Sequence, residues 1–225
     1  MLRGIRTAGV DRIWCLGDLV GYGADPDFCV RTCVARSERC LAGNHDLAVA
    51  GIVGLERFAG HAHAALTWTR EALSPALITQ LGVLKPSDTT GPAALFHASP
   101  LDPIWQYVLS GEEALDILRE TRTELNFVGH THLPAAWRMT SVGDLEGGFV
   151  AGEGSMSLTP GRWLINPGSV GQPRDGDARA AWLLLDLDAK VIVFRRTPYD
   201  VAAAQGAILK AGLPSVLATR LADGR

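Results

Sequence analysis

The chain has 225 residues, of which 47% are apolar and 20% are charged. This balance is typical of a globular protein with a substantial core, and the length fits one large domain or two small ones. The formal net charge of −3 excludes the electrostatic footprint of a protein that binds nucleic acid or an anionic membrane. No apolar run is long enough for a membrane span, and no signal peptide is recognisable.

The cysteines do not have the spacing of a zinc ribbon or a thioredoxin motif. They lie at positions 15, 29, 33 and 40. A chain of this length, with nearly half of its residues apolar, does not depend on disulfides for its stability. We therefore expect reduced, mostly buried thiols and a cytoplasmic protein.

The first part of the chain alternates short apolar runs with helix signals. Residues 1–10 have the pattern of the last turns of a helix that stops at Gly9, with no capping residue before it. Asp25-Pro26 and the capping box of Ser110 with Glu113 mark two further helix starts. The expected strands are 13–16, 39–42, 93–96 and 125–128, and the expected helices are 25–36, 61–73, 75–82 and 110–120.

The second part has a different pattern. Residues 135–196 combine glycine-rich turns with strand-like runs at 163–165, 181–187 and 191–195, which predicts an antiparallel meander. Two helices, opened by Asp200 and Pro214, are expected over about 200–223. Strand–helix alternation followed by antiparallel strands predicts a single domain, 1–225, of mixed α/β (α+β) class, with two packed sheets and helices outside.

Four expected strands end in polar residues. The strand ends deliver Asp18, then Asn44, His45 and Asp46, then His97, and finally His130 and His132. Ligands of open α/β sheets gather at the carboxyl ends of the strands, so these side chains are expected to meet at one edge. Each strand end alone is typical of a turn or a helix cap, but together they favour a metal site.

The candidate ligands are imidazole, carboxylate and amide oxygen, without a thiolate. This set suits Mn, Fe, Zn or Ni better than a cysteine-based structural zinc site. Two divalent metal ions about 3.5–4 Å apart can clamp a phosphate and activate a water for in-line attack. In such a pair, Asp18 is the natural carboxylate to share between both ions.

These motifs resemble the calcineurin-like metallophosphoesterase superfamily. The shared residues are Gly17-Asp18, Gly43-Asn44-His45-Asp46, His97 and Gly129-His130-Thr131-His132, in the family's order. The later segments Asn166-Pro167-Gly168-Ser169 and Gln172-Pro173-Arg174 resemble its small bacterial phosphodiesterase branch. The resemblance covers about residues 1–196 and implies a two-sheet sandwich flanked by helices, in four αββα layers.

The resemblance also implies roles for single residues. Asp18 would bridge two metal ions, Asn44, His97 and His130 would complete the second site, and His132 would bind the first metal. His45 would stand over the attacked phosphate as a hydrogen-bond donor or general acid, and Asp46 would orient its imidazole. Gly168, Ser169 and Gln172 are expected to contact substrate.

The sequence departs from the family pattern in two places. No Asp-x-His pair precedes Gly17, so we expect an N-terminally truncated chain that lacks the first strand and two ligands of the first metal, and that is weak or inactive. The loop Gly17 to Gly23 has Tyr22 where protein phosphatases and dinucleoside-tetraphosphatases of the superfamily carry arginine. This difference counts against those two substrate classes.

The sequence therefore predicts a metal-dependent phosphoesterase, and favours a phosphodiesterase that hydrolyses a small phosphorylated substrate. The alternative is a non-catalytic scaffold or interaction protein, derived from a hydrolase, that keeps one metal site. Retention of His45 and Asp46 favours the enzyme, because neither is needed merely to hold a metal. His61 and His63 imitate a ligand pair, but a two-residue step on a helix directs them to different faces. The oligomeric state stays open.

Overall fold

The computed structural model describes residues 1–225 as helices around three sets of strands. The helices are α1 (Leu2–Thr7), α2 (Pro26–Arg36), α3 (Asn44–Val49), α4 (Gly60–Ala72), α5 (Pro75–Val83), α6 (Gly111–Glu120), α7 (Val201–Lys210) and α8 (Ser215–Asp223), with a 3₁₀ turn at Leu55–Arg57. The strands are β1 (Trp14–Cys15), β2 (Arg39–Cys40), β3 (Ser87–Asp88), β4 (Ala94–Phe96), β5 (Leu125–Phe127), β6 (Ala135–Met139), β7 (Leu145–Phe149), β8 (Gly154–Ser157), β9 (Arg162–Asn166), β10 (Ala180–Asp186) and β11 (Val191–Thr197).

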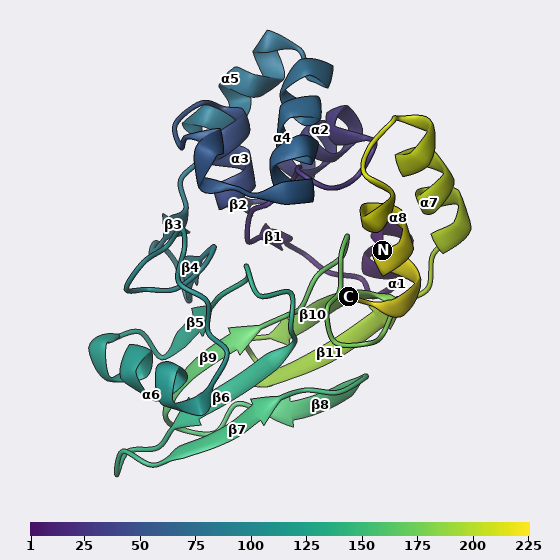
Figure 1. The fold of residues 1–225 in the computed structure, drawn as a ribbon. Coiled ribbons are helices and arrows are strands. Elements are labelled where there is room, and N and C mark those ends of the chain that lie inside the picture. Colours follow the sequence, from purple (N-terminus) through teal and green to yellow (C-terminus); the bar gives the residue numbers. More distant parts are fainter.

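The strands form a six-stranded sheet, a three-stranded sheet and a parallel pair. Their orders are β3-β4-β5-β9-β6-β7, β10-β11-β8 and β1-β2. The six-stranded and three-stranded sheets lie one above the other, with helices on the outside (Figure 1). The predicted mixed α/β class is confirmed, while β1 and β2 form a short ribbon of their own instead of joining the three-stranded sheet.

The expected meander over 135–196 is only partly antiparallel. Strand β9 pairs antiparallel with β6 but parallel with β5, where Leu125 lies opposite Trp163. The chain thus inserts β9 between two strands that precede it. The reason is burial, since β9 has apolar residues on both faces, as a central strand requires.

The alternation along β9 shows how the two faces are used. Trp163 and Ile165 belong to the core between the two larger sheets, together with Phe127 and Phe194. Leu164 points the other way, into the cluster that α6 covers. Successive strand side chains point to opposite faces, so one strand anchors two apolar layers.

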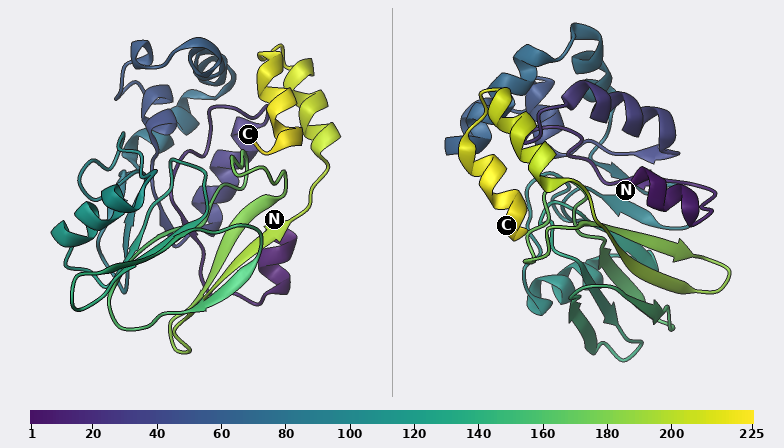
Figure 2. Two further views of the ribbon diagram at one scale, coloured as in Figure 1. Left: turned by 60° about the horizontal axis from the view of Figure 1, so that its bottom comes forward. Right: turned by 90° about the vertical axis from the view of Figure 1, so that its right-hand side faces the viewer.

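Helices α2 to α5 form a separate apolar cluster at the end of the molecule near β1 and β2 (Figure 1). Helix α1 lies beside β10 and β11 (Figure 2), where a Cβ on Gly4 would come within 3.5 Å of Trp182. The predicted helix starts at Pro26, Pro75 and Gly111 agree with the structure. The sequence did not predict α3 or β3, which are six and two residues long.

The two C-terminal helices form a hairpin against α4. Its core contains Leu217 and Leu221 of α8, Ile208 of α7 and Ala65 of α4, and Tyr22 and Trp68 pack against it. The hairpin therefore spans from the helical layer to the sheets (Figure 1). None of the helices combines the length and the apolar character that crossing a membrane requires.

Candidate metal centre

The loops after β1 and β5 have strained backbones at the predicted ligands. Asp18, His130 and His132 all have positive φ, at 52°, 61° and 62°. Side chains with a Cβ rarely adopt this conformation, and it persists where the surrounding structure enforces it, often at functional sites. All three candidate ligands thus have a backbone conformation that the surrounding loops must enforce.

Two glycines let the first loop approach the second one closely. A Cβ on Gly43 would lie 1.9 Å from Asp18 Oδ1, and a Cβ on Gly17 would lie 2.5 Å from the Gly43 nitrogen. Only residues without a side chain fit this contact. The approach lets the backbone N–H of His45 donate a hydrogen bond of 3.1 Å to Asp18 Oδ1.

The structure brings together ligand atoms from four segments of the chain. One ligand atom each from Asp18, His97 and His130 lies within 4.8 Å of the others. His97 Nε2 is 3.6 Å from Asp18 Oδ2, 3.2 Å from Asn44 Oδ1 and 3.2 Å from His130 Nδ1. The predicted convergence of these four residues is therefore present.

The hydrogen-bonding pattern of this cluster fits the binding of a cation. His97 Nδ1 lies 2.8 Å from the carbonyl oxygen of Leu16 and donates to it, which leaves Nε2 of the neutral ring with a lone pair. That lone pair faces oxygen atoms of Asn44 and Asp18, which accept hydrogen bonds too. Several acceptors directed at one point, with His130 Nε2 buried and unpartnered beside them, are the arrangement that a metal ion satisfies.

The pKa shifts of Asp18, His97 and His130 also fit the binding of a cation. Burial raises the pKa of Asp18 to about 7, although the His45 amide and Arg174 counteract it. Burial also lowers the pKa of His97, and lowers that of His130 to about 3. The imidazoles are therefore neutral at physiological pH, which is the form that binds metal, and the carboxylate lacks a nearby cation sufficient to keep it ionised.

His132 lies beside this group and contacts the opposite loop. Its Nδ1 donates a hydrogen bond of 2.6 Å to the carbonyl of Gln172, so Nε2 carries the free lone pair. Burial, then the charge of Arg174, lowers its pKa to about 3. His132 is not among the three residues whose ligand atoms lie within 4.8 Å of one another.

His45 occupies a space that a glycine leaves open. A Cβ on Gly21, whose φ is +121°, would lie 2.0 Å from His45 Nδ1. The ring of Tyr22 lies 4.5 Å from the imidazole and that of Phe58 lies 5.2 Å from it. His45 is 4% exposed and its Nδ1 has no hydrogen-bond partner. Burial, followed by His97, holds its pKa well below the usual value.

The expectation that Asp46 orients the imidazole of His45 differs from what the structure contains. Asp46 instead accepts hydrogen bonds from the backbone N–H groups of Gly43, Leu19 and Val20, at 2.8, 2.9 and 3.3 Å. Adjacent helical residues point in different directions, and Asp46 at the third position of α3 reaches back to the helix start. Its carboxyl group fixes the two loops to each other.

Of the three residues expected to contact substrate, Gln172 is the one with a free polar group. Gln172 is 3% exposed, and its Nε2 is buried without a partner. Ser169 Oγ accepts from the Gln172 backbone N–H at 3.0 Å. A Cβ on Gly168 would lie 2.8 Å from the side chains of Ala181 and Pro134. Gly168 and Ser169 thus shape the turn that carries Gln172.

Arg174 is a site residue that the sequence reading did not single out. Its Nη2 donates to Gln172 Oε1 at 3.1 Å, and its backbone N–H donates to the His132 carbonyl at 3.4 Å. Its Nε is buried and unpartnered. The segment Gln172-Pro173-Arg174 was noted as a motif, but no spacing rule indicates that this arginine faces the metal ligands.

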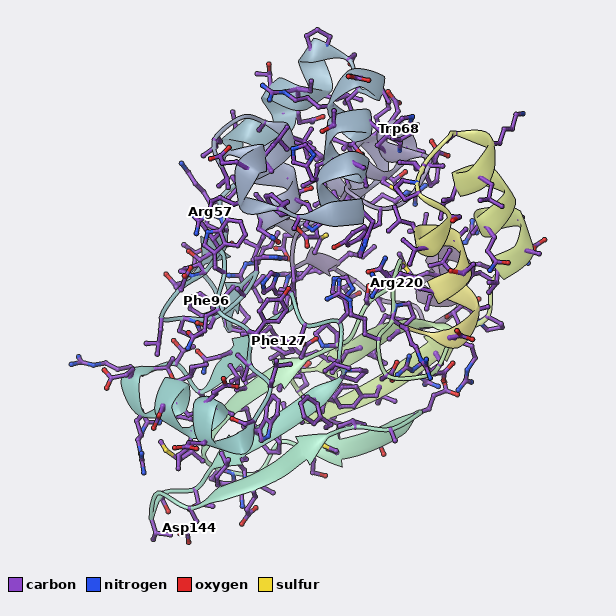
Figure 3. The ribbon with its side chains drawn as sticks, viewed as in Figure 1. Arg57, Trp68, Phe96, Phe127, Asp144 and Arg220 are labelled. Carbon is purple, nitrogen blue, oxygen red and sulfur yellow. The ribbon has the colours of Figure 1, made fainter.

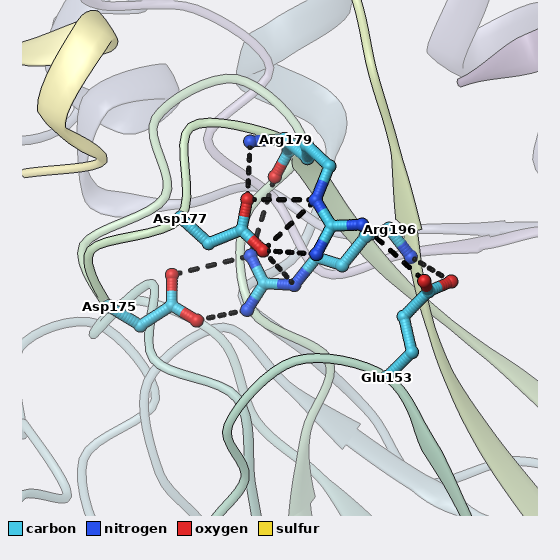
Figure 4. A network of polar contacts seen from close by, with 5 residues as sticks. All are labelled: Glu153, Asp175, Asp177, Arg179 and Arg196. Carbon is cyan, nitrogen blue, oxygen red and sulfur yellow. Dashed lines mark hydrogen bonds and ion pairs between the residues drawn. The ribbon is translucent and has the colours of Figure 1, made fainter.

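An ion-pair network holds the loop that carries Arg174 (Figure 4). Arg196 of β11, whose side chain is fully buried, pairs with Asp175 and lies 3.8 Å from Asp177. Arg179 bridges Asp177 and Glu153 in the same network. A buried guanidinium is stable only when acidic groups pair with it, so these ion pairs give the loop a defined position.

Aromatic rings outside the predicted motifs complete the surroundings. The Tyr107 ring lies 4.1 Å from the His130 ring, and Trp105 packs 5.4 Å from Phe58. Tyr107 is 44% exposed. These residues lie in a segment without helical or strand period, so no sequence signal pointed to them. His61 and His63 lie on α4 and are not part of the cluster.

Comparisons with known proteins agree with this geometry. Residues 1–190 match the calcineurin-like phosphoesterase superfamily domain. An uncharacterized protein of Methanocaldococcus jannaschii is 36% identical over 233 residues, covering 100% of this chain and 91% of that protein.

Two solved structures have the same fold. The crystal structure of a metallophosphoesterase from Sphaerobacter thermophilus has a TM-score of 0.88 and 35% identity, covering 100% of this chain and 94% of that one. A hypothetical protein from Pyrococcus horikoshii OT3 has a TM-score of 0.77 at 19% identity, covering 100% and 90%, and supports the fold alone. The chain belongs to the calcineurin-like phosphoesterase superfamily.

Proposed function

We propose that the protein is a phosphodiesterase that hydrolyses a small phosphorylated substrate with divalent metal ions. The observation that carries the proposal is the cluster of imidazole, amide and carboxyl ligand atoms around His97 Nε2, together with the buried, unpartnered Nδ1 of His45. When bound, the metal ions would polarise the P–O bond and lower the pKa of a coordinated water. The remaining chemistry is assigned to residues of the chain.

Asp18, Asn44, His97 and His130 would hold one ion. Asp18 and His132 would contribute to the other ion, the first metal of the family resemblance. We expect this first site to be the weaker one, because two recognised ligands hold an ion less firmly than four. Mn, Fe, Zn and Ni all suit this ligand set.

His45 would act on the substrate as a neutral hydrogen-bond donor. Its lowered pKa means that the ring is uncharged at neutral pH, so it has one N–H to donate and no excess proton. Directed at a non-bridging or leaving oxygen, this donor would stabilise the charge that develops there. Asp46 would support it indirectly, by fixing the loop of Leu19 and Val20 against α3.

Gln172 and Arg174 would bind the phosphoryl group from the other side. The unpartnered Gln172 Nε2 and Arg174 Nε are donors, and donors of this kind match phosphate oxygens. The Arg174 guanidinium lies close enough to lower the pKa of His45, His130 and His132. It therefore adds positive charge where an anionic substrate would bind.

The test is hydrolysis of bis(p-nitrophenyl) phosphate and of p-nitrophenyl phosphate by the full chain with Mn²⁺, before and after His45→Ala. We expect faster turnover of the diester, and a loss of at least about 100-fold in kcat for His45→Ala. His63→Ala is the control, since that exposed histidine lies on α4. Equal rates for the His45 variant and the wild type contradict the role of His45.

The same experiment separates the enzyme from a scaffold. Retained metal with no hydrolysis of either ester would favour the non-catalytic metal-binding protein, and a preference for the monoester would favour a phosphomonoesterase. Metal content is measured by mass spectrometry on the same samples.

A further inference from the structure

The C-terminal hairpin of α7 and α8 contacts the site although it follows the part of the chain that matches the family domain, residues 1–190. The backbone N–H of Gly176 donates a hydrogen bond of 3.0 Å to the carbonyl of Gly224, at the end of α8. A Cβ on Gly224 would lie 2.6 Å from the Asp177 backbone. The loop that carries Arg174 and the end of α8 are thus in direct contact.

The hairpin also reaches the site through Tyr22. This ring packs against the apolar core of the hairpin and lies 4.5 Å from the ring of His45. One side chain therefore separates α8 from the residue that we assign to the leaving or non-bridging oxygen. A group on the inner face of α8 is close to whatever binds at His45.

Arg220 is that group. It extends from α8 toward the middle of the molecule, between the helical layer and the sheets (Figure 3). Its Nε donates to the carbonyl oxygen of Arg225, and no Asp or Glu side chain lies within ion-pair distance of it. The Gly176–Gly224 hydrogen bond brings the loop of Arg174 against the end of α8 that carries Arg220. In keeping with this contact, burial and then the charge of Arg174 lower the pKa of Arg220.

The charges of Arg174 and Arg220 disfavour each other, and neither arginine pairs with an Asp or Glu side chain. Arg174 is paired only with the neutral Gln172 amide, and its buried Nε is free. Gln172, which is 3% exposed, adds the unpartnered Nε2 amide group next to Arg174. Unpaired cations with unsatisfied donors are stabilised by an anion placed between them.

The two arginines differ in what they face. The charge of Arg174 acts on His45, His130 and His132, so Arg174 is assigned to binding the phosphoryl group. The backbone of Arg174 contacts His132 directly, whereas α8, which carries Arg220, reaches His45 through Tyr22. Arg220 is therefore placed beside a part of the substrate that lies beyond the phosphoryl group.

We propose that Arg220, together with Arg174, forms a subsite for a second anionic group of the substrate, a carboxylate or a further phosphate. This inference rests on the proposed function, because it needs the first phosphoryl group at the metal centre. It makes α8 a determinant of specificity and defines the substrate as a phosphorylated molecule with two separate negative charges.

The test compares two phosphonates that are not hydrolysed and that differ by one carboxylate, propylphosphonate and 3-phosphonopropionate. Binding to the full chain loaded with Mn²⁺ is measured by isothermal titration calorimetry. We expect 3-phosphonopropionate to bind at least about tenfold more tightly to the wild type, the effect of a charged hydrogen bond. In Arg220→Gln we expect the two Kd values to become equal within about twofold.

Arg220→Lys keeps the positive charge but loses the planar guanidinium group that donates two parallel hydrogen bonds. This variant should therefore retain part of the preference for 3-phosphonopropionate. Lys210→Gln on α7, an exposed position with the same change in charge, should retain all of it. Because the preference is electrostatic, it should also shrink as salt is raised from 50 to 500 mM in the wild type, roughly as the Debye length shortens. That measurement needs no variant and holds even where Arg220→Gln does not fold.

A wild type without preference, a preference that survives in Arg220→Gln, or one that salt does not change would overturn the subsite while leaving the proposed function standing. Failure of both phosphonates to bind the loaded wild type would instead contradict the phosphoryl site itself. The two failures are therefore distinguishable.

Discussion

His97 Nε2 lies 3.2 Å from Asn44 Oδ1, and neither atom has a hydrogen to offer the other. The Nδ1 proton of His97 is committed to the carbonyl of Leu16. Two buried acceptors at this distance repel unless something positive lies between or beside them. The contact joins the loop after β2 to the loop after β4. A cation bound at this contact would therefore hold the two loops together.

Replacing His97 by alanine should remove metal from this site. Loss of an outer partner of a ligand typically costs about 10- to 100-fold in affinity, so loss of the ligand itself should cost at least about 100-fold. The measurement is Mn²⁺ binding by calorimetry, with metal content of the purified protein. His63→Ala, on the exposed face of α4, should bind as the wild type does; unchanged affinity in His97→Ala would exclude this histidine as a ligand.

Gly21→Ala should displace the imidazole of His45 without removing metal. The new methyl group would lie 2.0 Å from His45 Nδ1, and φ at this position is +121°. We expect kcat for the diester to fall at least about tenfold, as misplacement of a catalytic donor does, with metal content unchanged. Gly23→Ala in the same loop is the control, because a Cβ there has nothing within 4 Å. If both variants have wild-type rates, His45 is not held by this contact.

Metal affinity should depend on pH through Asp18. Its pKa is raised to about 7 by burial, so below pH 7 a cation must displace a proton from this carboxyl group. The observed Kd should therefore rise about tenfold for each pH unit below 7 and level off above it. His130 and His132, with a pKa of about 3, are neutral throughout this range and contribute no such slope.

The measurement is Mn²⁺ titration at pH 6, 7 and 8 in buffers of different ionisation enthalpy, which also counts the protons released. About one proton should leave at pH 6 and almost none at pH 8. A Kd that is constant from pH 6 to 8 would show that Asp18 is already ionised in the metal-free protein.

The candidate metal ligands were recognisable in the sequence because each follows a short apolar strand. A glycine precedes the candidate in Gly17-Asp18, Gly43-Asn44 and Gly129-His130, and the parallel pairings of β1 with β2 and of β4 with β5 bring the ends of each pair of strands together. Order along the chain and the family resemblance together singled out Asp18, Asn44, His97 and His130. The sequence pattern contains no distances, but residues at neighbouring strand ends are expected to lie close together.

Other residues have no such pattern. Arg174 and Arg220, which we propose to contact the substrate, lie in a loop and on α8, and the Gly176–Gly224 contact and the ion pairs of Arg196 hold these two segments. Asp46 was assigned to the wrong partner, because a residue next to His45 in sequence points elsewhere on a helix. Long-range packing decides these positions, and local sequence does not record it.

Arg196→Met should destabilise the protein and loosen the substrate loop. The side chain of Arg196 is fully buried, pairs with Asp175 and lies 3.8 Å from Asp177, and breaking a buried pair costs about 3–5 kcal/mol. We expect the free energy of unfolding to fall by about 3 kcal/mol, with a higher KM. Arg195→Met, at the exposed neighbouring position of β11, should change stability by less than about 0.5 kcal/mol. Equal effects in urea denaturation would exclude the network of Figure 4 as the anchor of this loop.

Gly224→Ala should separate α8 from the substrate loop. Both Gly224 and Gly212 have positive φ, at 62° and 73°, so alanine at either position costs about 1–2 kcal/mol of backbone strain. Only at Gly224 does the new Cβ also meet backbone, 2.6 Å from the Asp177 nitrogen, whereas at Gly212 it has nothing within 4 Å. The difference between the two alanine variants therefore isolates the contact of Gly224 with the Asp177 backbone.

We expect Gly224→Ala to lose more stability than Gly212→Ala. It should also lose the preference for 3-phosphonopropionate, because Arg220 moves away with the end of α8. Were Gly212→Ala to lose that preference equally, strain in the hairpin, and not its contact with the loop at Gly176, would determine where Arg220 lies.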